Sequence, residues 1–428
     1  MIPTRIPGRW VIAGFLLGVA AILYLRLIPF SFVWLGHVPF ERITWRPLNL
    51  RDVPLNVLLF IPFGFGLSGV LVRRGRRSGI WPRVLLIGLA LSTMLETLQM
   101  FMPERVPSPA DVLANGIGAL LGYGLYRAWA MGFGRALDRY ATRRNLILGL
   151  TLYALGAALL TAYLYRSVRL SNWDASFPLV VGNEAVGKRQ WSGRVERLEL
   201  ASGLRDSPDY VARYDLDGEA PFAAADGNPV PPLDWRDGPA TPQTGAGVQV
   251  GPGEWLATDA PFSDFTVAAR GFNSFTIRAA VASDDPQQRG PARIVSVSAD
   301  AERRNVTLGQ EKDAFIIRLR TPAGGENGQK PEILVPGVFT DGRLRRIVVI
   351  YDAPNLQVSV DGDEYALSLA PGAAFFSGFQ TTNRWPVTLG ADPRRYDWAY
   401  WGIIAGLGAL LFGGLAVAKR VMTAADRA

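Results

Sequence analysis

Acidic and amide side chains recur at helical spacing in the first third of the chain. The phrase Asp-Val-x-x-Asn occurs at Asp52–Asn56 and again at Asp111–Asn115, and Glu96 precedes Gln99 by three residues. Each spacing places two polar side chains on one face of a helix. Carboxylates and carboxamides on such faces can accept hydrogen bonds from the hydroxyl groups of a ligand. A carboxyl group in apolar surroundings can also transfer protons as a general acid or base.

Arg105 supplies a cation close to these acids, in the short segment between Met102 and Ser108. A guanidinium group can bind a phosphate of a ligand. It can equally form an ion pair that keeps Glu96 from being buried alone. The candidates for catalysis are therefore Glu96 as acid–base group, Asp111 as its partner and Arg105 as charge clamp.

Purely structural roles are the alternative for most of these residues. Ser108, Pro109 and Asp111 are typical of the N-cap, the first turn and the favourable acid at the start of a helix. The amides can serve as hydrogen-bonding contacts between helices: Asn56, Gln99 and Asn115. Glu96 is the hardest to explain in this way, because a carboxylate inside an apolar stretch must be paired, protonated or functional.

Six apolar stretches are candidates for helices that cross about 30 Å of hydrocarbon. They are residues 10–28, 53–72, 84–102, 109–126, 145–165 and 398–419. Arg26, near the end of the first, is expected to extend its side chain to the interface. The first stretch could instead be a cleaved signal sequence, since Arg5 and Arg9 precede it, but no clear small-residue cleavage site follows.

Basic residues between the stretches predict which side faces the cytoplasm. Arginines cluster after the second and after the fourth stretch, and Lys419 and Arg420 follow the last. These segments are expected inside, which places both termini in the cytoplasm and residues 171–395 outside. The polar side chains would then form one layer just beneath the outer face of the membrane.

The composition excludes several classes of protein. The 428 residues include no cysteine and one histidine, His37, so disulfide frameworks, zinc fingers, thiol nucleophiles and a Ser-His-Asp triad are not expected. No cofactor or metal is predicted for the membrane part. The net charge of +8 is explained mostly by arginines in the cytoplasmic loops, so no nucleic-acid partner is predicted.

Residues 171–395 have a different pattern. Short alternating stretches, such as residues 275–281, 293–297 and 315–319, are typical of half-buried strands, and Gly- and Pro-rich segments, such as residues 229–253, separate them. The clearest hairpin joins residues 346–352 to residues 356–362. This insert is therefore expected to be an all-β antiparallel sandwich of jelly-roll type, in a multidomain chain with a transmembrane helical bundle.

The order of these stretches resembles the concanavalin A-like, laminin-G-type sandwich. Residues 191–200 resemble the strand that usually closes such domains but come first here, whereas Tyr214–Gly218 resembles the usual opening, so we hypothesise a circular permutation. The resemblance implies glycan binding, for which the candidates are Trp191, Trp255, Asp300 and Asn305. Aromatic side chains in a β core more often only pack, and the polar oxygens could instead bind calcium.

Residues 1–126 resemble the VanZ-like family, and we assign residues 1–168 to that domain. The resemblance is carried by residues 52–65, by Glu96-x-x-Gln99, by Arg105 and by residues 111–118, in this order. The family includes a member linked to teicoplanin resistance, which implies a bacterial protein of the inner (cytoplasmic) membrane rather than a particular reaction. By motif position the ligand-binding residues would be Asp52, Asn56, Glu96, Gln99, Arg105, Asp111 and Asn115.

Three functions fit these features. In the first, which we prefer, the protein is not an enzyme: the sandwich binds a glycan, and the helices bind a membrane lipid or a lipid-linked saccharide. In the second, a membrane enzyme acts on a lipid-linked phosphorylated substrate, although no nucleophile or metal set is evident. In the third, the polar residues are structural and the sandwich docks a protein. The sequence makes no prediction of the oligomeric state.

Overall fold

The chain divides into two compact units, Met1–Leu159 with Trp401–Ala428, and Leu160–Tyr400. The structure is a computed structural model. It describes residues 8–27, 32, 34, 37–40, 43, 52–76, 78–102, 107–130, 142–204, 207–224, 230–236, 246–378, 387–389 and 394–413.

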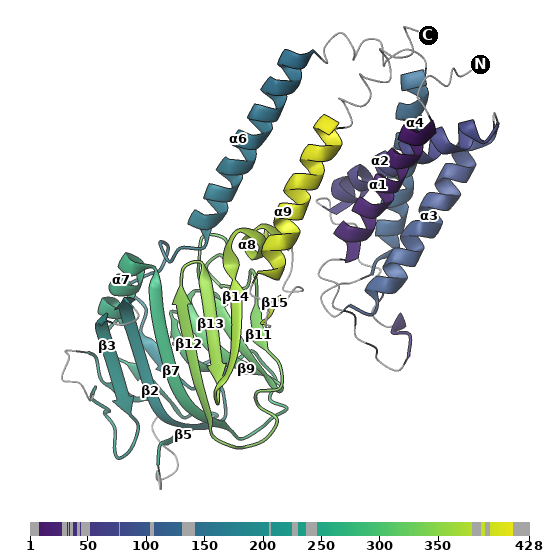
Figure 1. Cartoon of the computed structure of the whole chain (residues 1–428). Coiled ribbons are helices and arrows are strands. Elements are labelled where there is room, and N and C mark those ends of the chain that lie inside the picture. The colour runs from purple at the N-terminus through teal and green to yellow at the C-terminus, as the bar shows by residue number, and fades with distance from the viewer. Residues whose placement is uncertain are drawn as a thin grey trace. The chain divides into compact units, whose positions relative to one another are not determined.

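Long helices form where the apolar stretches predict them (Figure 1). They are α1 (Gly8–Leu27), α2 (Asp52–Arg73), α3 (Ile80–Gln99), α4 (Pro109–Ala128), α6 (Arg143–Ser167) and α9 (Arg395–Gly408), which continues as the π-helical turn η4 (Ala409–Gly413). Among the described residues, three helical segments are long and apolar enough to cross a membrane: Asn56–Arg73, Ile80–Gln99 and Arg143–Ser167. The chain is thus a membrane protein, and three of the six predicted spans meet this criterion.

Helix α3 is displaced from the predicted residues 84–102. It begins at Ile80, directly after Gly79 in the left-handed conformation (φ 63°), and it ends at Gln99. Pro82 is tolerated because the amides of a first turn have no partner within the helix. The chain then turns through Met100, so Glu96 lies in the last helical turn, nearer the helix end than the sequence suggested.

Helices α2 and α4 approach each other closely along their backbones. A Cβ atom added at Gly118 would lie 2.2 Å from the carbonyl oxygen of Val57, and one added at Gly122 would lie 2.2 Å from that of Ile61. On the facing helix, Gly64 is equally confined by the backbone of α4. Small residues permit such contact where lipid removes the hydrophobic drive for helix association. This packing fixes the distance between the polar ends of the two helices.

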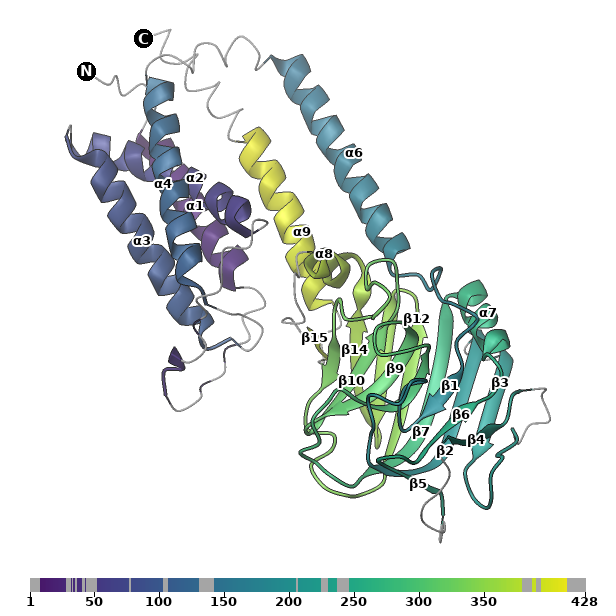
Figure 2. The ribbon, with the colours of Figure 1, turned by 180° about the vertical axis from the view of Figure 1, so that it is seen from behind.

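The unit Leu160–Tyr400 contains two β-sheets (Figures 1 and 2). Within the described residues, one sheet has eight strands in the order β15-β11-β10-β9-β8-β1-β6-β4, and the other has seven, β14-β13-β12-β7-β2-β3 with β5 paired to β2. Among the described pairs only β11 and β15 run parallel. The strands are β1 (Leu179–Val181), β2 (Gly193–Leu204), β3 (Ser207–Asp215), β4 (Leu233–Arg236), β5 (Val248–Val250), β6 (Trp255–Thr258), β7 (Ser274–Ser283), β8 (Ala292–Ser298), β9 (Arg304–Glu311), β10 (Ala314–Leu319), β11 (Ile333–Val335), β12 (Arg345–Asp352), β13 (Asn355–Val360), β14 (Asp363–Ser368) and β15 (Val387–Thr388).

Most strand predictions are confirmed. The expected hairpin is β12–β13, with Asp352 paired to Asn355. Strand β2 lies between β7 and β3, so the segment on which the permutation hypothesis depends does belong to the sheet. Two features were missed. The Gly- and Pro-rich residues 229–253 contain β4 and β5, and helix α7 (Ser263–Phe272) interrupts the run of strands.

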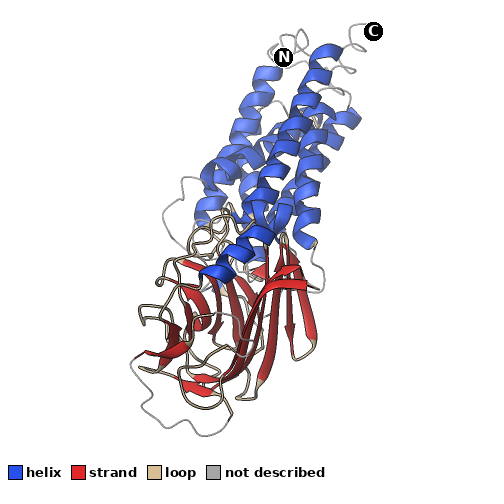
Figure 3. Cartoon of the chain, turned by 90° about the vertical axis from the view of Figure 1, so that its left-hand side faces the viewer, coloured by secondary structure: helices blue, strands red, loops and turns tan. Residues whose placement is uncertain are grey.

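The two ends of the insert leave the sandwich together. Helix α8 (Ala374–Ser377) follows the π-turn η3 (Leu369–Ala373), and Phe375 of α8 packs against Tyr400 of α9. The hydroxyl groups of Thr161 in α6 and Tyr400 lie 2.8 Å apart. Along the chain, the described strands all lie between α6 and α9, and Figure 3 shows them in red. Neighbouring termini are what allow a domain to be inserted into another.

Replacing Gly118 with Leu is expected to force α2 and α4 apart and to destabilise the helical unit by about 1–3 kcal/mol, since the added atoms meet backbone that cannot yield. The thermal midpoint of the purified protein in detergent would measure this. Gly124→Leu is the matched control, because a Cβ atom at Gly124 meets no atom within 4 Å. Equal midpoints for the two variants would contradict the close packing.

Candidate functional site

The side chain of Arg26 is the centre of the polar cluster. Its Nη1 donates to Asn56 Oδ1 at 2.8 Å, and its Nη2 pairs with Glu96 and, at 3.4 Å, with Asp111 Oδ2. Only 8% of Arg26 is exposed. The guanidinium group therefore joins α1, α2, α3 and α4 at one point.

The expectation that Arg26 extends to the interface was wrong. Two carboxylates and an amide lie within reach of its side chain inside the bundle, and these partners satisfy the guanidinium group there. Arg26 thereby provides the ion pair to Glu96 for which the sequence suggested Arg105. Arg105 itself lies outside the described residues. One signal in the sequence could have revealed Arg26: a buried carboxylate needs a cation, and Arg26 is a cation in the last turn of an apolar helix, one residue before α1 ends.

Helix α3 holds α1 through both Glu96 and Gln99. Gln99 Nε2 donates to the backbone carbonyl of Arg26 at 2.6 Å, while Glu96 binds the guanidinium group. The second oxygen of Glu96 accepts the Ser108 amide at 2.9 Å. Both oxygens of Glu96 are thus engaged, and this carboxylate is fixed in place.

The start of α4 has the local structure that the sequence predicts. Ser108 is the N-cap and accepts the Ala110 amide at 3.3 Å, and Pro109 opens the first turn. Asp111 lies in that turn, and its side chain is 24% exposed, against 7% for Glu96. Asp111 is therefore the more accessible of the two carboxylates.

No described contact joins Asn115 or Asp52 to Arg26. Asn115 lies one helical turn beyond Asp111, where its Nδ2 donates to Ser92 Oγ at 2.8 Å. This contact joins α3 to α4, as the structural alternative predicts. Asp52 is the first residue of α2, and its side chain lies outside the described part of the structure.

Among its described residues, the cluster contains more negative than positive charge. One guanidinium group faces two carboxylates, and Asn56 occupies its Nη1. Arg26 is consequently poorly placed to bind a phosphate, whereas Asp111 can accept further hydrogen bonds. The chemistry that this arrangement favours is the binding of hydroxyl or ammonium groups.

The glycan candidates of the sandwich lie mostly in its interior. Trp191 is fully buried and donates its Nε1 hydrogen to Gln310 Oε1 at 2.7 Å, and Trp255 is 6% exposed. Asn305 is also fully buried and bonds to the backbone of Asp174. Trp255 packs with Val180 and Ala257 beneath the segment that contains Ala185. Buried in this way, these side chains stabilise the fold and offer no stacking surface to a sugar.

Asp300 has a local role in the turn between β8 and β9. Its Oδ1 accepts the amides of Glu302 and Arg303, both at 2.8 Å, and its Oδ2 accepts Arg303 Nε. These bonds and the Arg303 charge hold the pKa of Asp300 below its usual range, against the opposing effect of burial. Within the described part of the chain, no three His, Cys, Asp or Glu side chains are grouped so that they could bind a metal ion.

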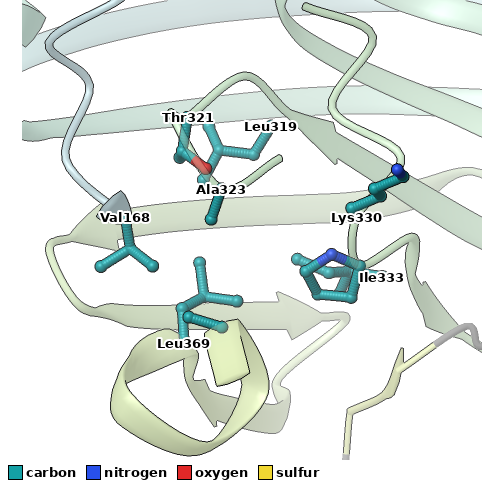
Figure 4. Close-up of a pocket in the computed structure, with 9 residues that line it drawn as sticks. Val168, Leu319, Thr321, Ala323, Lys330, Ile333 and Leu369 are labelled. Atoms are coloured by element: carbon teal, nitrogen blue, oxygen red, sulfur yellow. The ribbon is translucent and has the colours of Figure 1, made fainter. Parts of the chain in front are cut away.

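A small pocket lies in the sandwich near its junction with α6 (Figure 4). Its lining includes Val168, Leu319 and Leu369, with Thr321 and Lys330 as side chains that carry polar groups. The Thr321 hydroxyl already accepts the Gly324 amide at 2.9 Å. The pocket therefore lacks the convergent polar groups that a saccharide site requires.

The family model described as VanZ/LLP1 matches residues 10–130. This range spans α1 to α4 and includes every described contact of Arg26, so this part of the chain is a VanZ-like membrane domain. No curated protein and no solved structure that was compared with the chain matches it.

Replacing Arg26 with Met is expected to cost about 3–5 kcal/mol, because it leaves Glu96 buried without a cation. The thermal midpoint of the purified protein in detergent would report the loss. Arg83→Met is the control, since the described hydrogen bonds of the Arg83 side chain go to the carbonyl groups of Ser78 and Gly79 at the start of α3.

A double variant tests the cause of this loss. Combining Arg26→Met with Glu96→Met removes both charges, and we expect it to recover at least half of the lost stability. A double variant as unstable as Arg26→Met would show that the packing of Arg26, not its charge, is what matters.

Proposed function

We propose that this VanZ-like membrane protein recognises the hydroxyl- or ammonium-bearing head group of a membrane lipid or a lipid-linked saccharide precursor, at the outer face of a bacterial inner membrane. The observation that carries the proposal is the unequal charge around Arg26, where two carboxylates share one guanidinium group. A head group that donates hydrogen bonds to the cluster compensates the excess negative charge.

Asp111 is the residue through which we propose that the ligand binds. Glu96 is engaged at both oxygens, and Gln99 holds the backbone of Arg26. Asp111 is at the edge of the cluster, and its contact with Arg26 is the longest at 3.4 Å. A hydroxyl or ammonium group can therefore approach Asp111 without breaking the Arg26–Glu96 pair.

The sandwich provides the second half of the proposed function. The basic loops predict that residues 171–395 and the cluster are both on the outer side of the membrane. We propose a permuted concanavalin A-like domain that contacts the saccharide portion of the same precursor. Because Trp191 and Trp255 are buried, this contact would use other, exposed side chains.

A membrane enzyme is the second candidate, and the accessibility of Asp111 is the observation that favours it. Since the Arg26 and Ser108 contacts fix Glu96, the proton-transfer role assigned to Glu96 would pass to Asp111. Asp111→Asn distinguishes the two candidates. Weaker binding would favour recognition, whereas binding that persists together with loss of a measured turnover would favour the enzyme.

Asp111→Asn is expected to weaken ligand binding at least about tenfold, because one charge-assisted hydrogen bond becomes a neutral one. Native mass spectrometry of the full chain with phosphatidylglycerol, phosphatidylethanolamine and a polyprenyl-linked disaccharide would measure retention of each. Asp264→Asn is the matched control, since Asp264 is likewise an acid in the first turn of a helix, α7. Unchanged retention of all three lipids in Asp111→Asn would refute the proposal.

The resemblance to the VanZ-like family extends the proposal to glycopeptide resistance. Expression of the chain in a teicoplanin-susceptible bacterium is expected to raise the inhibitory concentration of teicoplanin, and Asp111→Asn to abolish the increase. Membrane fractions must contain equal amounts of the two proteins for the comparison. An inhibitory concentration that the wild-type chain leaves unaltered would remove this part of the proposal.

A further inference from the structure

Three arginines lie on one face of the eight-stranded sheet. Arg318 of β10 pairs with Thr307 of β9, Thr307 pairs with Ser296 of β8, and the Ser296 and Thr307 hydroxyl groups are 2.7 Å apart. Residues paired across antiparallel strands share a face. By the same register, Arg293 of β8 and Arg304 of β9 project from this face.

This face is turned away from the second sheet. Gln310 of β9 reaches Ser283 in β7 of the other sheet at 2.7 Å. Gly309 precedes Gln310, so Gly309 and its pairing partner Arg293 lie on the opposite side. An outward face of a sandwich is normally solvated, and arginines there are expected to be exposed.

The arginines are nevertheless buried, because loops cover them. Arg293 is 1% exposed and Arg304 is 0% exposed. The segment after β1 folds over the face, since its Ala185 packs against Val180, which shares that face with Ser296. The residue before Ala185 is Glu184, which is also 0% exposed.

One of the three arginines is fully paired. Arg318 Nε donates to Glu332 Oε2 at 2.9 Å, its Nη2 pairs with the same carboxylate, and its Nη1 donates to Asn327 Oδ1 at 3.2 Å. This pair is the ordinary way in which proteins bury charges.

Arg293 and Arg304 are not paired in this way. Arg293 uses Nη1 for the Pro291 carbonyl at 2.9 Å, and Arg304 uses Nη2 for the Ala301 carbonyl. Among the described residues, Arg293 Nε and Nη2 and Arg304 Nε and Nη1 have no hydrogen-bond partner. The two free N–H groups of Arg293 form the side of the guanidinium that binds oxyanions in a bidentate manner.

The pKa values of the two arginines also indicate that their positive charge is incompletely compensated. Burial lowers the pKa of Arg293 to about 8, and repulsion from Arg304 and Arg318 contributes. Burial also lowers the pKa of Arg304 to about 10, with repulsion from Arg318. Guanidinium groups stay protonated in proteins, so these shifts indicate buried positive charge that Glu184 compensates only in part. Burial raises the pKa of Glu184, and the charges of Arg293 and Arg304 only partly oppose this.

We propose that Arg293 and Arg304 form an internal binding site for a small oxyanion beneath the Glu184 loop, on the outward face of the eight-stranded sheet. A carboxylate, sulfate or phosphate group accepts from both free N–H groups of Arg293 and from Arg304. A metal cation does not fit, because the guanidinium groups donate hydrogen bonds and repel it. Because a loop covers the site, a free ion fits it better than an acidic substituent of a saccharide, whose sugar ring would have to enter as well.

Glu184 opposes the anion in this site. Its carboxylate lies among the same arginines, and it competes with the ligand for their charge. Removal of its charge is therefore expected to strengthen binding, which is the opposite of what the loss of a structural ion pair would do.

Isothermal titration of the full-length protein in detergent tests the proposal. Sulfate, phosphate, glucuronate and an oligouronate are titrated at constant ionic strength in chloride, so that general screening stays fixed. We expect saturable binding of sulfate or phosphate, at least about tenfold weaker binding in Arg293→Gln, and tighter binding in Glu184→Gln. Binding of the uronates alone would make the ligand an acidic saccharide with the same chemistry.

Arg303→Gln is the control, because Arg303 is an exposed neighbour paired with Asp300. It should bind the anion like the wild type. Should Arg293→Gln not fold, Glu184→Gln still decides the question, since it retains both arginines. The proposal is overturned if no anion binds saturably to the wild type, if Arg293→Gln binds equally well, or if Glu184→Gln binds more weakly.

Discussion

The burial of one guanidinium group constrains the whole arrangement of the first four helices. A charge inside an apolar bundle is tolerated only where partners surround it, and the partners of Arg26 come from α2, α3 and α4. The close backbone contact at Gly118 and Gly122 brings α2 and α4 near enough for Asn56 and Asp111 to reach the same cation. Packing of small residues and pairing of charges therefore depend on each other here.

The members of the polar cluster could be predicted from the sequence, but their centre could not. Spacing of three and four residues correctly placed Glu96 with Gln99 on one face of α3 and Asp111 at the start of α4. Arg26 was missed because an arginine near the end of an apolar helix ordinarily reaches the interface. Local spacing carries no information on which helix supplies the counter-ion of another, since that depends on how the helices pack.

For the sandwich, too, the sequence predicted local elements but not what packs against them. Alternating apolar residues identified β7, β8, β10 and the β12–β13 hairpin. They did not identify the short β4 and β5, where Gly and Pro dominate the surrounding sequence. Alternation also makes Arg293 and Arg318 outward-facing and hence seemingly solvated, whereas the segments that contain Ala185 and Asn327 cover this face. Tryptophans that looked available for sugar stacking, such as Trp191, fill the core instead.

The junction of α6 and α9 has a consequence for proteolysis. The chain enters the sandwich from α6 and leaves it into α9, and Thr161 and Tyr400 hold these helices side by side. A protease that cuts one surface loop leaves each fragment attached to its own helix, and the strands keep the fragments paired. Release of the β domain from its helices would therefore need two separate cleavages, one near each helix, whereas a domain on a single stalk is released by one.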